Sequence, residues 1–278
     1  MKKLYIDCTN GISGDMVLMA LKELGAAADL EGKVTYHIHE DDVPHHHHHH
    51  EHDHDHDHDH HHDHDHDHEH DHDHDHHHDH DHDHEHHHDH HHDHEHGHVH
   101  VSYGNVAHII DGSDLSMPVK AQAKAIYRVI ARAEGVAHGV AMEDVFFHEV
   151  GREQAVMQIV GVAQALDELG IEEIYCSPVH DGHGEIECSH GIIPVPVPAV
   201  KAMMDEADDM TFVTDEEVDT EMVTPSGLGV LIGIGSQCVS EMPEDFREAC
   251  EAGTLKMGVG KGTRDIGRDG LKIYLLED

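Results

Sequence analysis

The chain has 278 residues, and its 59 acidic against 16 basic residues give a formal net charge of −43. This balance argues against nucleic-acid binding, because phosphate contacts need clustered Lys and Arg. No run of 18 apolar residues is present, so we predict no membrane span. The five Cys form no C-x-x-C pair, which disfavours a disulfide framework or a zinc knuckle. Because the start also lacks the apolar region of a signal peptide, we expect a cytoplasmic protein.

The first 44 residues are predicted to begin a globular α/β domain. Residues 4–7 predict a strand, and a Gly-rich turn follows it. Ser13 is placed to cap the next helix, whose dense apolar residues stop at Gly25. Residues 33–39 alternate between apolar and polar side chains, which predicts a second strand.

Residues 45–98 contain 34 His, 19 Asp or Glu and one Gly. Without apolar side chains this segment cannot bury a core, so we predict a long disordered surface loop. Neutral imidazole suits nickel, zinc, copper and cobalt, and the interleaved carboxylates offset the charge of bound cations. We therefore predict a metal-binding insertion for storage or delivery, although a plain solvated linker is the alternative. The predicted ligands begin with His46, His48, His50, His52, His54, His56, His58 and His60.

Residues 99–278 are predicted to form the remainder of the globular domain. The patterns predict a return strand at 99–101, helices at 103–110, 119–134 and 153–169, strands at 173–177 and 184–189, a short helix ending at 204 after a Pro-rich stretch, a helix at 226–232, and strands at 255–259 and 271–276. Strands alternate with helices, which favours an α/β or α+β fold with a mixed sheet and flanking helices.

Two carboxylates bracket the first Gly-rich turn. Asp7 ends the predicted strand, and Asp15 follows Ser13 and Gly14 at the start of the helix. Such a pair is suited to holding a metal–phosphate unit, while the backbone N–H groups of the turn can face an anion. The alternative is that Asp15 only complements the helix dipole.

Two later segments carry metal-binding or acid–base side chains. His148 and Glu149 come just before a predicted helix and can bind a metal or transfer protons. His183 and His190 flank Cys188 in a Gly-rich stretch, which supplies soft and borderline metal ligands. A surface pair and an ordinary turn are the alternatives for the two segments.

Two further segments suit an anion. Thr224 and Ser226 place two hydroxyls at a predicted helix start. Lys261 and Arg264 bring two cations to a Gly-rich loop of an otherwise acidic chain. Both segments can hold a phosphate or a carboxylate, although the first also works as a simple helix cap without any ligand.

Taken in order, these segments resemble the nickel-insertion proteins of the lactate racemase maturation system, the LarC family. The matching stretches run along nearly the whole chain and form a specific ordered set. They are Asp7 with Gly11-Ile-Ser-Gly-Asp-Met16, Phe147-His-Glu-Val-Gly151, Val160-Gly161, Ala165-Leu166, Leu169-Gly170, His190-Gly-Ile-Ile-Pro-Val-Pro-Val-Pro198, Thr224-Pro-Ser-Gly227, and Gly258 through Gly262-Thr-Arg-Asp265. A His-rich insertion after the first third is also a habit of this family.

The resemblance implies a nickel chelatase of the metal-inserting lyase class. Its members insert nickel into a pyridinium bisthiocarboxylate mononucleotide to form the nickel-pincer cofactor of lactate racemase. They use CTP with Mg or Mn, which the family associates with a portion following the Gly-Thr-Arg-Asp segment. We therefore expect a separate C-terminal half polypeptide and a client nickel enzyme as partners; self-association is left open.

The resemblance also implies roles for the residues singled out above. The expected catalytic residues are Asp7, Asp15, His148, Glu149 and His190. The expected substrate-binding residues are Ser13, Gly14, Thr224, Ser226, Lys261 and Arg264. His183 joins the His-rich segment as an expected metal ligand.

The sequence departs from the family at Gln154 and Gln158, where Asp is usual. Gln keeps hydrogen bonding but lacks the negative charge that favours a cation. This departure supports a second hypothesis, a non-catalytic nickel or zinc storage or delivery protein. A third hypothesis is a phosphate-ester or nucleotide hydrolase that uses Asp7 and Asp15 with a divalent ion.

Overall fold

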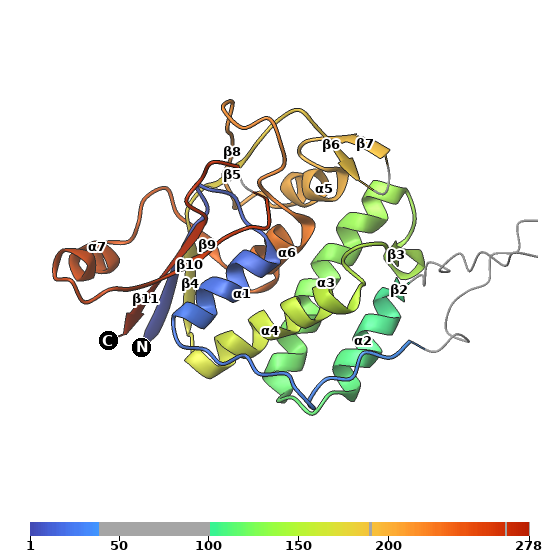
Figure 1. Ribbon diagram of the computed structural model, residues 1–278, viewed down its shortest axis with the longest axis horizontal. Helices are drawn as coiled ribbons and strands as arrows, with labels where there is room; N and C mark the ends of the chain where they lie inside the picture. The colour runs from blue at the N-terminus through green and yellow to red at the C-terminus, as the bar shows by residue number, and fades with distance from the viewer. Residues whose placement is uncertain (39–100, 189–190, 265, 278) are drawn as a thin grey trace, which may run out of the picture. The chain divides into compact units, whose positions relative to one another are not determined.

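The computed structural model describes residues 1–38, 101–188, 191–264 and 266–277 (Figure 1). Within them a five-stranded mixed sheet has the strand order β10-β11-β1-β4-β9. At its centre β1 (Lys2–Asp7) pairs antiparallel with β11 (Leu271–Glu277) and parallel with β4 (Glu173–Cys176). The edges are β10 (Lys256–Gly260), antiparallel to β11, and β9 (Gln237–Cys238), parallel to β4.

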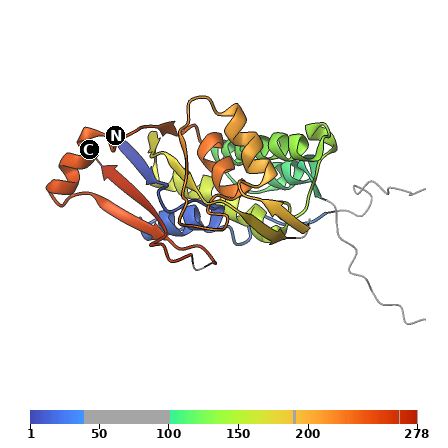
Figure 2. The same ribbon diagram turned by 90° about the horizontal axis from the view of Figure 1, so that it is seen from above.

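The two faces of this sheet bury different side chains of β1, because successive residues of a strand point to opposite faces. Leu4 and Ile6 belong to the main hydrophobic core. Tyr5 belongs to a smaller cluster with Phe246, and their ring centroids lie 6.0 Å apart. Phe246 comes from α7 (Glu244–Glu251), which lies on the side of the sheet away from α3 and α5 (Figure 2).

The main core is formed between the sheet and a layer of helices. These helices are α1 (Gly14–Glu23), α2 (Tyr103–Gly112), α3 (Met117–His138), α4 (Glu153–Leu169), α5 (Pro198–Glu206) and α6 (Pro225–Gly233). Helix α3 packs against α4, α5 and α6 (Figure 1). The approach of α6 requires Gly233, because a Cβ there would lie 2.5 Å from the Cα of Ile126 on α3. The predicted fold class, a mixed sheet with flanking helices, is confirmed.

One predicted strand is wrong. Residues 33–38 form no strand, and residue 39 lies outside the described part of the chain. The apolar residues of this alternating segment do pack against the core, including Val34 and Tyr36. Their neighbours, however, are connections between helices and strands. The backbone N–H of Asp114 donates to the carbonyl of Lys33, and the Tyr36 hydroxyl donates to the carbonyl of Gly151. The alternation of apolar and polar side chains in this segment therefore reflects burial of one of its sides against the core, and no neighbouring strand pairs with it among the described residues.

Several short elements were not predicted. Among the described residues these are β5 (Val179–Asp181) with β8 (Phe212–Thr214), β7 (Gly191–Pro194) beside the predicted β6 (Glu185–Cys188), β3 (Phe146–Phe147), the 3-10 turn Met142–Asp144, β9 and α7. The predicted return strand is confirmed only at β2 (Val101–Ser102), which pairs with β3.

The predicted division into 1–44, 45–98 and 99–278 stays a prediction, since residues 39–100 lie outside the described part. None of the described helices is both long and apolar enough to cross a membrane.

Candidate functional site

A cavity of about 1150 Å³ gathers most of the residues singled out from the sequence. Its walls come from the starts of α1 and α6, the end of α3, the residues after β3, the β6–β7 hairpin and the β10–β11 loop. The predicted site residues that line it are Ser13, Asp15, His148, Glu149, Thr224, Ser226, Lys261 and Arg264. Segments that are far apart in the chain therefore meet here.

The N-termini of α1 and α6 meet at one wall of the cavity. The backbone N–H of Gly14, the first residue of α1, donates to the Ser226 hydroxyl at 3.2 Å. Thr224 caps α6 by accepting from the N–H of Gly227 at 3.1 Å, and its hydroxyl lies 3.0 Å from that of Ser226. Helix N-termini carry partial positive charge and unpaired N–H groups, so two of them together favour an anion.

A close approach of two backbones fixes this arrangement. The N–H of Ile12 donates to the carbonyl of Met222 at 2.9 Å, and the N–H of Thr224 donates back to the carbonyl of Ile12 at 3.0 Å. Gly11, at φ +79°, makes the approach possible, because a Cβ there would lie 2.3 Å from the carbonyl oxygen of Met222. The Gly-Ile-Ser-Gly turn is therefore required for packing as well as for the site.

Asp181 holds the other side of this contact and is a residue that the sequence analysis missed. Its side chain is buried, with 2% of the residue exposed. One carboxylate oxygen accepts from the N–H groups of Gly182, Met222 and Val223 at 2.9, 2.9 and 3.0 Å. Burial raises the pKa of Asp181, while these three hydrogen bonds oppose the rise. Asp181 positions the segment that leads into α6.

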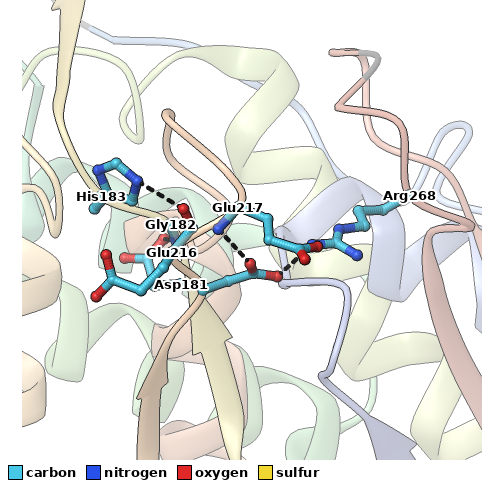
Figure 3. A network of polar contacts seen from close by, with 7 residues as sticks. Asp181, Gly182, His183, Glu216, Glu217 and Arg268 are labelled. Carbon is cyan, nitrogen blue, oxygen red and sulfur yellow. Dashed lines mark hydrogen bonds and ion pairs between the residues drawn. The ribbon is translucent and has the colours of Figure 1, made fainter.

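The β10–β11 loop brings cations to the cavity. Arg264 lies 3.3 Å from a carboxylate oxygen of Glu221, and Lys261 lines the same wall. Arg268 also lines the cavity and forms an ion pair with Asp215 at 2.6 Å. A second ion pair joins Arg268 to Glu217 at 3.2 Å, and both of these residues are labelled in Figure 3. The loop thus contributes three cationic side chains to the lining of the cavity, two of which are in ion pairs with acidic residues.

Glu221 is a second residue that sequence reasoning missed. Its side chain is only 10% exposed. Burial raises its pKa to about 7; Arg264 opposes this rise, and the charges of Asp181 and Glu149 add to it. A carboxyl group with a pKa near neutrality is suited to accepting and releasing a proton.

A group of carboxylates and imidazoles lines another part of the cavity. Glu134 and His138 of α3 lie beside the predicted His148 and Glu149. Burial, with the Glu149 charge as the second cause, raises the pKa of Glu134 to about 7. The i,i+4 spacing of Glu134 and His138 on one helix was the available sequence signal for this pair. In the parts of the chain that the structure describes, no three His, Cys, Asp or Glu side chains meet closely enough to form a finished metal centre.

The structure places other predicted residues outside the cavity. Asp7 accepts hydrogen bonds from the backbone and hydroxyl of Thr9 at 3.1 and 2.7 Å, so it stabilises its own turn. Nε2 of His183 donates a hydrogen bond to the carbonyl of Glu216 at 3.2 Å (Figure 3). Gly14 contributes only through the backbone contact described above. His190 and the predicted ligands between residues 45 and 98 lie outside the described residues.

Two details of the sequence prediction change. Ser13 does not cap α1 through its side chain, because its hydroxyl donates to Asp15 instead. Gln158 lines the cavity, whereas Gln154 lines only a separate hollow beside α1.

Comparisons with known proteins cover nearly the whole chain. A family model described as "Nickel insertion protein" matches residues 4–277. The chain is 34% identical over 278 residues to the pyridinium-3,5-bisthiocarboxylic acid mononucleotide nickel insertion protein of Alkaliphilus metalliredigens, with 99% of this chain and 61% of that protein covered. It is 44% identical over 164 residues to the protein of the same name from Acetivibrio thermocellus, with 59% and 38% covered.

A third relative of that name, from Staphylococcus epidermidis, is 31% identical over 266 residues, with 95% of this chain and 56% of the relative covered. The chain thus spans less than two thirds of the length of these relatives. No solved structure matches it.

Proposed function

The chain belongs to the nickel insertion protein family, and we propose that it inserts nickel into pyridinium-3,5-bisthiocarboxylic acid mononucleotide within this cavity. The product is the nickel-pincer cofactor that is required for the maturation of lactate racemase. One observation carries the proposal: a single cavity combines paired helix N-termini, which suit a phosphate, with a group of carboxylates and imidazoles, which suits a transition metal.

The phosphate of the mononucleotide is proposed to bind at the starts of α1 and α6. The Ser226 and Thr224 hydroxyls lie there, and Lys261 and Arg264 supply positive charge. A phosphate held by helix dipoles and two cations leaves the aromatic ring of the substrate to extend along the cavity. Asp181 and Gly11 serve as positioning residues, because they fix the contact between the two helix starts.

Insertion exchanges one ring proton for nickel(II). Nickel bonds to the two thiocarboxylate sulfurs and to the ring carbon between them, the C–H bond breaks, and no oxidation state changes. We propose that the carboxylate of Glu221 accepts the departing proton. Its pKa of about 7 means that a large fraction of Glu221 side chains is deprotonated at neutral pH. His148, which the sequence suggested for metal binding or proton transfer, lies beside Glu134 and His138, and His190 lies outside the described residues.

Other parts of the activity are proposed from the resemblance alone. The His-rich segment gathers nickel, CTP acts with Mg or Mn through a separate C-terminal half polypeptide, and the product passes to a client enzyme. We assign no residue of this chain to CTP. The cytoplasmic location stays a prediction.

The rival hypothesis is non-catalytic storage or delivery of nickel or zinc, which does not explain why the cavity combines helix N-termini with carboxylates and imidazoles. A full-length variant with Asn at every His from 45 to 98 separates the two. Product formation is measured with the mononucleotide, CTP, Mg²⁺ and the C-terminal half of a longer relative. An enzyme retains turnover in this variant at ample nickel and loses it only when nickel is scarce. A variant inactive at every nickel concentration, beside an intact chain that binds nickel without making product, supports storage instead.

A further inference from the structure

The last turn of α3 presents a carboxylate and an imidazole on one side. Glu134 and His138 are separated by four residues, and Oε2 of Glu134 lies 3.6 Å from Nε2 of His138. Two ligands about 2.0–2.2 Å from one metal ion are roughly 3 Å apart. The pair therefore stands close to the separation that a shared ion requires.

A second imidazole is held against this pair by the structure around it. The ring centroids of His148 and His138 are 5.6 Å apart. His148 follows Phe147, whose ring packs on Tyr127 of α3 with centroids 5.9 Å apart. The Tyr127 hydroxyl also donates to the carbonyl of Val150 at 2.9 Å. The residues on both sides of His148 are thus fixed to α3, which preorganises its position.

The local charge favours a cation here. Helix α3 has 22 residues, and its C-terminal end, at His138, carries partial negative charge. The Glu134 side chain is 17% exposed, and Glu149 adds a second negative charge near it. In the described part of the chain, the ion-pair partner of Glu134 is His138 rather than Lys or Arg. A bound divalent cation neutralises this concentration of charge.

We propose that Glu134, His138 and His148 bind one divalent transition-metal ion, with Glu149 balancing its charge. Among the described residues the three side chains do not yet form a coordination sphere, so the proposal requires the His148 ring to move toward Glu134 and His138 when the ion binds. Two imidazoles and a carboxylate suit nickel, cobalt or zinc, whereas Mg²⁺ and Ca²⁺ prefer oxygen ligands throughout. The inference rests on the proposed function in one respect: the ion bound here is the nickel that is later inserted.

The test measures metal binding without any nucleotide. The full-length chain with Asn at every His from 45 to 98 is titrated with Ni²⁺ and with Co²⁺ by equilibrium dialysis, after circular dichroism has verified its fold. One equivalent is expected to bind. Loss of a direct ligand should exceed the roughly 10- to 100-fold cost of changing an outer-shell group, so Glu134→Gln and His138→Ala should each raise Kd more than tenfold. The matched controls His108→Ala and Glu143→Gln, at exposed positions outside the cavity, should leave Kd unchanged.

Oxidation by bound copper gives an independent readout in the same full-length Asn variant, in which the His-rich segment cannot compete for the metal. Copper(II) binds the same N and O ligands with higher affinity than nickel. In the presence of peroxide, bound copper oxidises the His residues nearest to it. Peptide mass spectrometry should find oxidised His138 and His148 in the Asn variant and severalfold less when Glu134→Gln is added to it. The proposal is overturned if the folded Asn variant binds no equivalent, or if both substitutions leave Kd and oxidation unchanged.

The site and the proposed function fail separately. If the chain binds one equivalent of metal but forms no product, the metal site stands and the proposed insertion activity is refuted. If Glu134→Gln and His138→Ala leave product formation unchanged, the insertion activity stands, but this site is not the source of the inserted nickel.

Discussion

The Ser226 hydroxyl accepts a hydrogen bond from the backbone N–H of Gly14, although the two residues are 212 positions apart in the chain. This contact joins the N-terminus of α6 to that of α1 and creates a wall of the cavity with partial positive charge. The motif Gly-Ile-Ser-Gly and the motif Thr-Pro-Ser-Gly therefore form one continuous wall of the cavity.

Removing the Ser226 hydroxyl should weaken substrate binding more than folding. Ser226→Ala loses the acceptor for Gly14 and a polar group facing the cavity. One hydrogen bond to a charged group is worth about 1.5 kcal/mol or more, so the Kd for the mononucleotide should rise about tenfold. The free energy of unfolding should fall by only about 1 kcal/mol. Calorimetric titration and urea unfolding measure the two effects, with the exposed Ser240→Ala as control. Unchanged affinity would place the phosphate elsewhere.

Gly11→Ala should be much more destabilising than Gly170→Ala. Both glycines have a similar positive φ, +79° and +67°. Gly170 has nothing within 4 Å of an added Cβ, so its variant reports the backbone cost alone, about 1–2 kcal/mol. Gly11 adds the collision with Met222, which costs roughly 1–3 kcal/mol more. Equal unfolding free energies for the two variants would mean that the contact between Gly11 and Met222 does not stabilise the fold.

Asp181→Ala and Asp181→Asn should differ strongly. Ala leaves the N–H groups of Gly182, Met222 and Val223 buried without their acceptor, which costs on the order of 3 kcal/mol. Asn keeps an oxygen acceptor for them, so most of the stability should return. Thermal unfolding of both variants measures this difference. Equal losses would show that the carboxylate charge, and not the acceptor geometry, matters at this position.

Glu221→Gln should remove a pH dependence of stability. The folded-state pKa of Glu221 is raised from 4.5 to about 7, so the folded protein binds this proton more tightly than the unfolded chain. The resulting stability is fully present below pH 4.5 and is lost as the pH rises through about 7. Across that window the variant should gain up to roughly 3 kcal/mol relative to the wild-type chain.

Urea unfolding at several pH values from 4.5 to 8 measures this difference. Arg264→Ala is the informative comparison, because it removes the cation that lowers the pKa of Glu221 and should move the loss to higher pH. Parallel pH profiles for the wild-type chain and Glu221→Gln would contradict a buried, protonatable Glu221.

The long helices and the central strands could be predicted because local pattern and tertiary environment agree. The apolar residues of α3 and α4 recur at helical spacing, and each of these helices ends at a Gly in the left-handed conformation. The strand predicted at 33–39 failed because side-chain alternation reports which face is buried and not whether a neighbouring strand exists. Helix α7 was missed because it is short and charged, with only Phe246 and Ala249 buried.

The site was predictable where a motif concentrates polar side chains on a helix start, as at Asp15 and Ser226. Asp181 and Glu221 were not, since an acidic chain offers many similar carboxylates and only tertiary packing buries these. Asp7 shows the reverse case: its position at a strand end suggested a ligand, yet the adjacent Thr9 binds its carboxylate. Burial and long-range partners decide these roles, and a single sequence does not encode them locally.

The most direct measurement of the central claim is nickel transfer to the mononucleotide by the intact chain. The reaction contains the substrate, Ni²⁺, CTP and Mg²⁺, with and without the C-terminal half of a longer relative, and mass spectrometry detects nickel in the small-molecule product. Lys261→Ala combined with Arg264→Ala tests the cavity; Lys201→Ala combined with Arg247→Ala, at surface ion pairs outside it, is the control.

We predict product from the wild-type chain under at least one condition, a loss of more than tenfold in the cavity variant, and unchanged activity in the control. No product from the folded, nickel-loaded wild-type chain under either condition, or equal product from the cavity variant, would contradict the assignment of this cavity to nickel insertion.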